Sequence, residues 1–242
     1  MLHRSIPPVK KKTWMGDGGA QMPLRIGHRG AAGYAPENTL SALAKAITLR
    51  ADMAEFDVQR TKDDKLVVIH DKRVDRMTNV EGRVSDMNLS ELRKLVVKED
   101  ERIPTLEEIL NSANGRIGLV LEVISPGAGK ETHDLVVKNR FQGPVIYASF
   151  LHSELLDIRD ADAGTKTLAL FEGVPVRPTG FAEDVGATHV GLAIDSITEP
   201  FVQALHSAGL AVFIYTVNHP SDIAWMKSMR VEGIISDFPD RV

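Results

Sequence analysis

The sequence of 242 residues contains no cysteine and no long apolar run. Without cysteine, the chain can form neither disulfides nor zinc–thiolate sites, and it cannot use a thiol as a nucleophile. No apolar stretch reaches the roughly 18 residues that a membrane-spanning helix needs, so we expect no stable membrane insertion. Any bound metal must therefore take oxygen or imidazole ligands.

The chain also has no excess of positive charge. It carries 29 basic and 33 acidic residues, for a net charge of −4, whereas binding to a phosphate backbone usually requires a basic face. We therefore expect no nucleic acid partner. The apolar share of 43% is enough to build the core of one large α/β domain or of two small ones.

The N-terminal segment 1–22 differs in character from the rest of the chain. It holds a basic run, Lys10 to Lys12, without the apolar segment that a secretory signal peptide would need. Because it shows no apolar periodicity, we expect a flexible tail over residues 1–22 and one folded domain over residues 23–242. The basic run could bind an anionic surface, although a solvated tail is the favoured interpretation. The lack of a signal and of cysteine favours the cytoplasm.

From residue 24 onward, short apolar runs alternate with segments of helical period, which is typical of βα units and a parallel sheet. Two of these runs are separated only by the segment 59–65, which is too short for a crossover helix and predicts a β-hairpin turning at Asp63 and Asp64. The other eight strands predict a (β/α)8 TIM barrel rather than a doubly wound sheet. The nine expected strands are Leu24–His28, Met53–Val58, Leu66–His70, Ile117–Val123, Val145–Ser149, Thr167–Phe171, His189–Ala193, Ala211–Val217 and Gly233–Ser236.

Residues 71–103 are the least strand-like part of the predicted domain. They are mostly polar and charged, with one short helical pattern that begins at Ser90. We interpret them as a small inserted segment, an enlarged loop after the hairpin. Loops of this kind lie over the C-terminal mouth of a barrel, where they can wall a substrate pocket.

Carboxylates are unusual inside a predicted barrel strand, where buried apolar residues such as Val and Ile are expected. Glu55 and Asp57 lie two residues apart, so their side chains share one face of a strand. Two anions this close repel each other unless a cation lies between them, and Glu122 adds a third carboxylate near the end of the next parallel strand. Oxygen ligands of this sort bind Mg²⁺ or Ca²⁺. The pattern predicts a divalent metal, and salt-bridged carboxylates are the alternative.

Two histidines are expected beside these carboxylates. A two-residue turn in the hairpin would put Asp57 directly opposite His70, and His28 ends the first strand. Imidazole titrates near neutral pH, so a pair of histidines flanking a metal can act as general acid and base in turn. Next to His28, Arg29 and the backbone amides of Gly30–Gly33 would suit a phosphate group. Together these groups predict phosphoester hydrolysis or transfer.

At this point the sequence resembles the glycerophosphodiester phosphodiesterase family, over about residues 24–240. The resemblance depends on several motifs that occur in order. They are His-Arg-Gly at 28–30 with Pro-Glu-Asn-Thr at 36–39, Glu-Phe-Asp at 55–57, Val-Ile-His-Asp at 68–71 followed by Arg76 and Thr78, Pro-Thr-Leu-Glu-Glu at 104–108, Leu-Glu at 121–122, Ser-Phe at 149–150, Thr-Val-Asn at 216–218, and Gly-Ile-Ile-Ser-Asp at 233–237 with Pro239.

The resemblance implies a TIM barrel with a segment inserted after the His70 motif, and hydrolysis of a glycerophosphodiester to sn-glycerol 3-phosphate and an alcohol. Whether a cyclic phosphate forms first or water attacks directly stays open. By position, the family's metal ligands, for Mg²⁺ or Ca²⁺, correspond to Glu55, Asp57 and Glu122, its acid/base pair to His28 and His70, and its phosphate contact to Arg29.

Two aromatic residues are further candidates for contact with the substrate. Phe150 follows a predicted strand and could pack against the glycerol or the headgroup, with packing at the rim as the alternative. Tyr215 stands where members of the family often have an aromatic residue, and packing in the core is the alternative. Asn218 and Asp237, also at strand ends, are interpreted as turn or helix-cap residues.

The sequence departs from the family pattern at two places. Ile124 stands where members commonly have a lysine near the phosphate, and Lys130 or Arg73 could replace that charge. After Asp237 the chain stops where members usually add a helix. Part of the barrel wall would then be open, or covered by the N-terminal tail or by a second subunit in a homo-oligomer. These departures leave two alternatives, a lysophospholipase D-like phosphodiesterase and a weakly active phosphodiester-binding barrel.

Overall fold

The computed structural model describes residues 22–242, so the predicted tail lies, except for Met22, outside the described residues. Strand β1 (Leu24–Gly27) pairs with both β2 (Met53–Arg60) and β9 (Gly233–Ser236), and all pairs in the sheet are parallel except β2 with β3 (Leu66–Val68). The eight parallel strands therefore close into a ring, which confirms the predicted (β/α)8 TIM barrel. The remaining strands are β4 (Gly118–Val123), β5 (Val145–Ser149), β6 (Lys166–Phe171), β7 (His189–Ala193) and β8 (Ala211–Tyr215).

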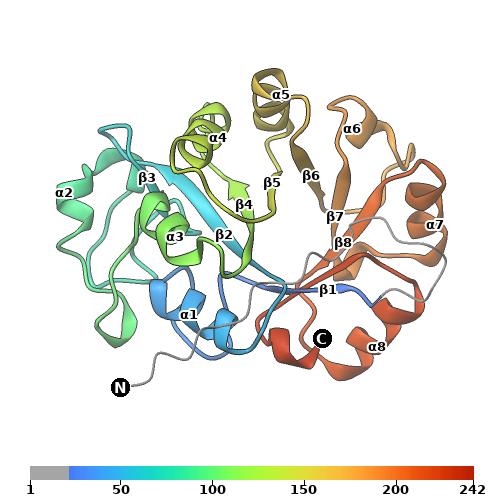
Figure 1. Ribbon diagram of the computed structural model, residues 1–242, viewed down its shortest axis with the longest axis horizontal. Helices are drawn as coiled ribbons and strands as arrows, with labels where there is room; N and C mark the ends of the chain where they lie inside the picture. Colours follow the sequence, from blue (N-terminus) through green and yellow to red (C-terminus); the bar gives the residue numbers. More distant parts are fainter. Residues whose placement is uncertain (1–21) are drawn as a thin grey trace.

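The helices lie around the outside of the strands (Figure 1). The first of them, α1 (Leu40–Thr48), begins after Thr39, whose side chain accepts a hydrogen bond from the backbone N–H of Ala42 at 3.2 Å, as expected for a cap. The longer helices that follow are α3 (Leu106–Ala113), α4 (Gly129–Lys138), α5 (His152–Ala161), α7 (Glu199–Ser207) and α8 (Pro220–Ser228), with the short α6 (Gly180–Glu183) and the 3₁₀ turn η3 (Ile194–Ser196) between α5 and α7.

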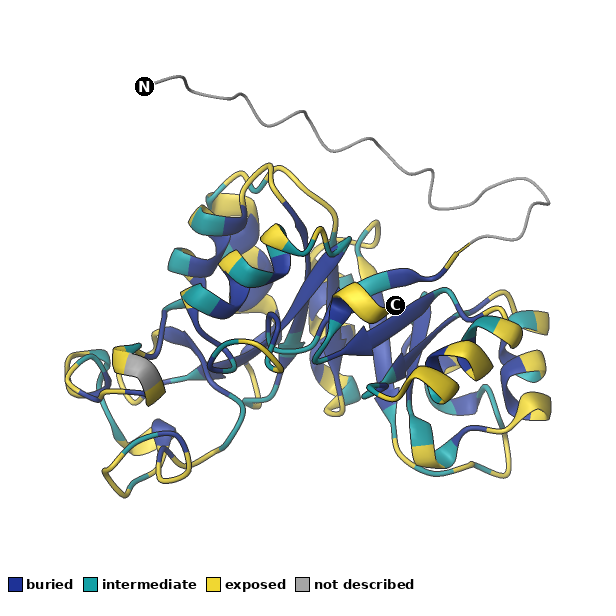
Figure 2. Cartoon of the chain, turned by 90° about the horizontal axis from the view of Figure 1, so that it is seen from below, coloured by how far each residue is buried: buried dark blue, intermediate teal, exposed yellow. Residues whose placement is uncertain are grey.

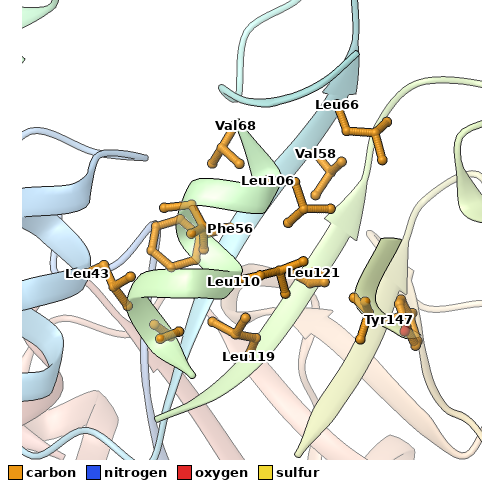
Figure 3. Packing of buried hydrophobic residues seen from close by; sticks show 14 of the residues in the cluster. Leu43, Phe56, Val58, Leu66, Val68, Leu106, Leu110, Leu119, Leu121 and Tyr147 are labelled. Carbon is orange, nitrogen blue, oxygen red and sulfur yellow. The ribbon is translucent and has the colours of Figure 1, made fainter. Parts of the chain in front are cut away.

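Alternate residues of each strand face opposite sides, which produces two apolar layers. In β2, Phe56 faces outward and packs with Leu110 of α3 (Figure 3). Met53 belongs to a separate cluster that fills the barrel interior. Glu55 and Asp57 share the face of Met53, so they also point into the barrel, closer to its C-terminal mouth. Figure 2 shows the same division, with buried strands in the middle and exposed residues on the outer faces of the helices.

The register of the hairpin differs from the prediction. Asp57 lies opposite Ile69, whose backbone N–H donates to the Asp57 carbonyl at 3.0 Å, and not opposite His70. The reason is the loop 62–64, which has three residues where the prediction had two. Its last residue, Asp64, has a φ of 55°. A left-handed residue at the end of a three-residue loop is a common hairpin geometry, and it shifts the pairing by one position.

The inserted segment forms a small packed unit beside β3 (Figure 1). It contains η1 (Val84–Asp86), α2 (Leu89–Leu92) and η2 (Lys98–Asp100). Its buried side chains pack together with Val67 of β3 and with Ile69 just after it, and they form a core separate from the barrel clusters. That core consists of Val67, Ile69, Val74, Met77, Val84, Leu92, Leu95, Val97 and Ile103.

The end of the chain packs against the barrel. After β9, the turn η4 (Pro239–Arg241) brings Val242 into a cluster with residues of α8, and Lys227 donates a hydrogen bond to the Val242 carbonyl at 3.0 Å. The pairing of β1 with β9 closes the ring of strands. After β9 the described chain holds only the turn η4, and an opening in the outer wall there, or its cover by the tail or a second subunit, stays a prediction. Within residues 22–242, no helix combines the length and the hydropathy needed to cross a membrane.

Candidate active site

An open pocket of about 590 Å³ lies at the C-terminal mouth of the barrel. One wall comes from strand ends and carries Glu122, Ile124 and Phe150. The other wall is the start of the inserted segment, which carries most of the charge. His70, just before the segment, lines the pocket together with Asp71, Lys72, Arg73, Asp75 and Arg76.

Three predicted metal ligands come together at this mouth. Glu55, Asp57 and Glu122 each offer an oxygen, and these oxygens all lie within 4.8 Å of one another. The parallel register of β2 and β4 explains the arrangement, because it sets Asp57 directly beside Glu122. The alternation along β2 adds Glu55 on the same inward face.

The electrostatics of this cluster fit a cation. Burial and the neighbouring carboxylates of Asp57 and Glu122 raise the pKa of Glu55 well above its ordinary value. Burial, and then Asp57, raise the pKa of Glu122 to about 8, although Arg29 acts in the opposite direction. Glu55 Oε1 is buried with no hydrogen-bond partner among the described residues. Crowded carboxylate oxygens, one of them buried without a donor, suit a hard divalent cation such as Mg²⁺ or Ca²⁺.

Asp57 is held by Asn38, a residue of the Pro-Glu-Asn-Thr motif that was not among the predicted site residues. Asn38 Nδ2 donates to Asp57 Oδ2 at 2.7 Å, and Asn38 Oδ1 accepts from the Asp57 backbone N–H at 3.2 Å. Arg29 Nε faces the same Oδ2 at 3.4 Å. Both contacts therefore use one carboxylate oxygen and leave Oδ1 of Asp57 for a metal.

His28 lies at the end of β1 and contacts an aspartate from the far end of the chain. Its Nδ1 is 2.7 Å from Asp237 Oδ1, and Asn218 Nδ2 donates to Asp237 Oδ2 at 2.6 Å. Although burial acts to raise the pKa of Asp237, the hydrogen bonds bring it below its ordinary value. An ionised carboxylate only accepts, so His28 carries its proton on Nδ1 and keeps Nε2 for other partners. Asp237 and Asn218 are thus more than turn residues.

His70 lines the pocket and has a matching arrangement. Its Nδ1 is 2.7 Å from Asp71 Oδ1. Hydrogen bonds from Arg76, and more weakly from His70, lower the pKa of Asp71 to about 2. This carboxylate is therefore ionised and accepts a hydrogen bond from the His70 Nδ1–H. Each histidine therefore has an aspartate on Nδ1 and, among residues 22–242, no hydrogen-bond partner on Nε2, which is the geometry that a general acid or base needs.

Arg29 is surrounded by carboxylates. Its backbone N–H donates to Glu55 Oε2 at 2.7 Å, and its Nη1 donates to Glu37 Oε1 at 2.7 Å. The side chain is 17% exposed, and its Nε has no hydrogen-bond partner within the described structure. Contact of Arg29 with a phosphate stays a prediction.

The predicted amide cradle at Gly30–Gly33 is wrong. The N–H of Gly30 donates to the Glu55 carbonyl and that of Gly33 to the Asp237 carbonyl, each at 3.0 Å. These amides therefore fix the loop against β2 and β9 and do not face a ligand. Gly30 is needed because its φ is +90° and a Cβ there would lie 2.7 Å from the backbone carbon of Ala42.

The two aromatic candidates contact each other. Phe150 is exposed and lines the pocket, and its ring meets Tyr215 edge-on with the centroids 6.0 Å apart. The Tyr215 hydroxyl donates to the Phe171 carbonyl at 3.2 Å. Tyr215 is not among the residues that line this pocket, and contact of Phe150 or Tyr215 with the substrate stays a prediction.

Of the two cations considered as replacements at the Ile124 position, only one is near. Lys130 bonds Asp134 on α4 and does not line the pocket. Arg73 lines the pocket, and its Nε donates to Asp75 at 2.7 Å. Ile124 itself gives the strand-end wall an apolar surface.

Comparison with known proteins shows which family the chain belongs to. The model of the glycerophosphoryl diester phosphodiesterase family matches residues 28–241. The chain belongs to this family. This confirms the resemblance drawn from the sequence motifs, and it identifies the chain as an enzyme of the phosphoric diester hydrolase class.

Sequence relatives and solved structures agree with this membership in the family. The Bacillus subtilis protein YhdW is 36% identical over an alignment of 229 residues, which covers 89% of this chain and 94% of its own. A glycerophosphodiester phosphodiesterase from Caldanaerobacter subterraneus subsp. tengcongensis is 35% identical and covers 90% of this chain and 95% of its own. A phosphodiesterase structure from Oleispira antarctica, in complex with the product sn-glycerol-3-phosphate, has a TM-score of 0.84 at 25% identity, with 90% and 94% of the two chains covered.

The metal-free form of this family member should lose stability as the pH rises. Glu122 has an ordinary pKa of 4.5 and a pKa of about 8 in the fold. A carboxyl group with a higher pKa in the folded state stabilises the protein fully below its unfolded pKa, and this stability is lost as the pH rises through the folded value. In EDTA we expect the unfolding temperature to fall between about pH 4.5 and pH 8, and to fall less for Glu122→Gln. Equal slopes in both proteins would contradict the assignment.

Proposed function

We propose that this protein hydrolyses glycerophosphodiesters to sn-glycerol 3-phosphate and an alcohol, with a divalent metal held by Glu55, Asp57 and Glu122 and with His28 and His70 as general acid and base. The observation that carries the proposal is the cluster of three carboxylate oxygens within 4.8 Å of one another. In a family of phosphodiesterases, such a cluster supports a metal-dependent reaction at phosphate.

The chemistry divides between the metal and the side chains. A bound Mg²⁺ or Ca²⁺ would neutralise the carboxylates and polarise the phosphoryl oxygens. One imidazole, neutral with its proton on Nδ1, accepts at Nε2 the proton of the attacking hydroxyl or water. The other acts as an imidazolium, which carries protons on both ring nitrogens; it donates its Nε2 proton to the oxygen of the departing alcohol and is left neutral. Asp237 and Asp71 hold the two rings through Nδ1, so the two nitrogens are already oriented before substrate binds. These roles apply to direct attack by water and to a cyclic phosphate intermediate alike.

The direct test is an assay with glycerophosphocholine and either Mg²⁺ or Ca²⁺. We expect sn-glycerol 3-phosphate and choline in equal amounts. Phosphocholine and glycerol as products would show cleavage of the other ester bond and contradict the proposal. Tight binding of the diester with no product under either metal would favour the weakly active phosphodiester-binding barrel.

The pocket also favours a second candidate, a lysophospholipase D-like activity. Ile124 and Phe150 give the strand-end wall an apolar surface. The loop after β6 adds Val174 and Val176, both exposed, among the strand-end loops of the barrel. An acyl chain on the glycerol could pack against such a surface. A higher kcat/KM for lysophosphatidylcholine than for glycerophosphocholine would favour this activity.

Ile124→Lys should shift the preference toward small water-soluble diesters. A charged contact to phosphate contributes about 1.5–3 kcal/mol, which corresponds to roughly a tenfold or larger fall in KM for glycerophosphocholine. Ile124→Leu is the control, because it keeps the apolar surface and adds no charge. If both variants change KM equally, position 124 does not contact the phosphate.

Three expectations stay predictions. They are a location in the cytoplasm, the absence of a nucleic acid partner, and assembly as a homo-oligomer. Sedimentation of the purified protein at several concentrations would test the last of these.

A further inference from the structure

Arg76 of the inserted segment bonds two carboxylates that come from different parts of the chain. Its Nη1 and Nη2 donate to the two carboxylate oxygens of Glu37 at 2.9 and 2.6 Å. Its Nε donates to Asp71 Oδ2 at 2.5 Å, and Nη2 also reaches Asp71 Oδ1 at 3.2 Å. Glu37 precedes α1, whereas Asp71 follows β3. One guanidinium thus ties the first loop of the barrel to the inserted segment.

Each of these carboxylates also holds a residue of the proposed active site. Asp71 Oδ1 lies 2.7 Å from His70 Nδ1, and Glu37 Oε1 accepts a hydrogen bond from Arg29 Nη1 at 2.7 Å. Arg29 in turn donates its backbone N–H to Glu55. The contacts form an unbroken series from His70 to the carboxylate cluster.

We infer that Arg76 is a positioning residue, which holds His70 through Asp71 in the tautomer that keeps Nε2 free for the substrate and fixes His70 relative to Arg29. The inference depends on the proposed function for its kinetic consequence. The His70 side chain has no other hydrogen-bond partner among the described residues, and much of it is exposed. Its orientation therefore depends on Asp71, and that of Asp71 depends on Arg76.

The guanidinium group has the shape that this role needs. It is planar, and its N–H groups point in fixed directions, so it can bond two carboxylates at once along different edges. An ordinary exposed ion pair contributes little to stability. The Arg76 side chain is 46% exposed. We therefore expect it to contribute little to stability and to act through the fixed directions of its hydrogen bonds. A lysine at this position would keep the charge and lose the two-sided contact.

The first test compares Arg76→Gln with Arg93→Gln. Arg93 is a matched control because it lies in the same inserted segment, is 37% exposed, and bonds a single carboxylate, Glu108, outside the pocket. For Arg76→Gln we expect kcat on glycerophosphocholine to fall about 10- to 100-fold, with KM changed less than about threefold. Arg93→Gln should keep the wild-type kcat. Equal losses in both variants, accompanied by equal falls in unfolding temperature, would overturn the inference.

Arg76→Lys keeps the positive charge and changes only the hydrogen-bond geometry. It also provides a second test if Arg76→Gln does not fold. If Arg76 positions Asp71 and His70 through its fork of N–H groups, the lysine variant folds as the wild type does and still loses most of kcat. Full kcat in Arg76→Lys would show that only the positive charge matters, and it would overturn the positioning role.

The tautomer of His70 can be measured without any substrate. In long-range ¹H–¹⁵N spectra of the histidine rings, with the His70 signals assigned by their loss in His70→Gln, we expect the wild type to show neutral His70 protonated on Nδ1. Arg76→Gln should shift these signals toward a mixture of both tautomers, and Arg93→Gln should leave them unchanged. An unchanged His70 spectrum in Arg76→Gln would overturn the inference. A shifted spectrum in a protein that cleaves no glycerophosphodiester would support the positioning role and contradict the proposed function instead.

Discussion

Replacing His70 with alanine should lower kcat on glycerophosphocholine by at least about 100-fold. A positioned acid or base contributes roughly 10²- to 10⁴-fold to a reaction rate, and His70 lines the pocket with Nδ1 already on Asp71. Because its Nε2 is the nitrogen left for the substrate, the loss should be in kcat more than in KM. Steady-state kinetics with saturating Mg²⁺ or Ca²⁺ measures this, and added imidazole should restore part of the rate.

His206→Ala is the control for this variant. His206 contacts Glu232 at 3.2 Å and lies on α7, outside the pocket. The substitution His206→Ala also removes an imidazole from a partly exposed position. Because His206 lies outside the pocket, this variant should keep kcat close to the wild-type value. Near-normal turnover in His70→Ala would exclude His70 as an acid or base.

Replacing Glu55 with glutamine should lower the activity and abolish stabilisation by the metal, but it should not destabilise the metal-free protein. The substitution keeps the shape and removes one of three crowded charges. We expect kcat to fall by at least about 100-fold, as for the loss of a metal ligand. Addition of Mg²⁺ or Ca²⁺ should no longer raise the unfolding temperature, because a ligand stabilises only a fold that binds it.

In EDTA the same variant should be at least as stable as the wild type. Burial and the charges of Asp57 and Glu122 disfavour an ionised Glu55, so its removal relieves repulsion in the metal-free protein. Glu131→Gln is the matched control, because Glu131 is an exposed carboxylate that pairs with Arg60 away from the pocket. If Glu55→Gln still gains stability from the metal as the wild type does, Glu55 is not a ligand.

The carboxylate cluster was predictable from the sequence because it depends on regular strands. Alternation along one strand sets Glu55 and Asp57 on one face, and parallel pairing brings Glu122 to the same mouth. The barrel itself was predictable for the same reason, since nine apolar runs and one short connection leave few arrangements. These inferences need only strand periodicity and the order of the strands.

Contacts through irregular segments were not predictable in this way. His28 and Asp237 are separated by 209 positions and meet only because β9 closes the barrel beside β1. Asn38 stood out only as part of the Pro-Glu-Asn-Thr motif, yet its side chain holds Asp57. Arg76 lies in an inserted segment whose sequence has no clear helix or strand periodicity. Only the resemblance to the family motif pointed to this residue.

The two errors in the site have local causes. The hairpin loop holds three residues, and one extra residue moves His70 out of the position opposite Asp57. The glycine-rich loop was expected to offer free amides, but those of Gly30 and Gly33 bond carbonyls of neighbouring strands. In both cases the outcome depends on backbone hydrogen bonds that composition does not encode.

The most direct measurement is the release of sn-glycerol 3-phosphate from glycerophosphocholine by the wild-type protein before EDTA, after EDTA, and after Mg²⁺ or Ca²⁺ is added back. We predict turnover, its loss with the chelator, and its recovery with one of the two metals, with no recovery in Glu55→Gln. Full turnover in EDTA, or no product under any of these conditions, would contradict a metal-dependent glycerophosphodiesterase.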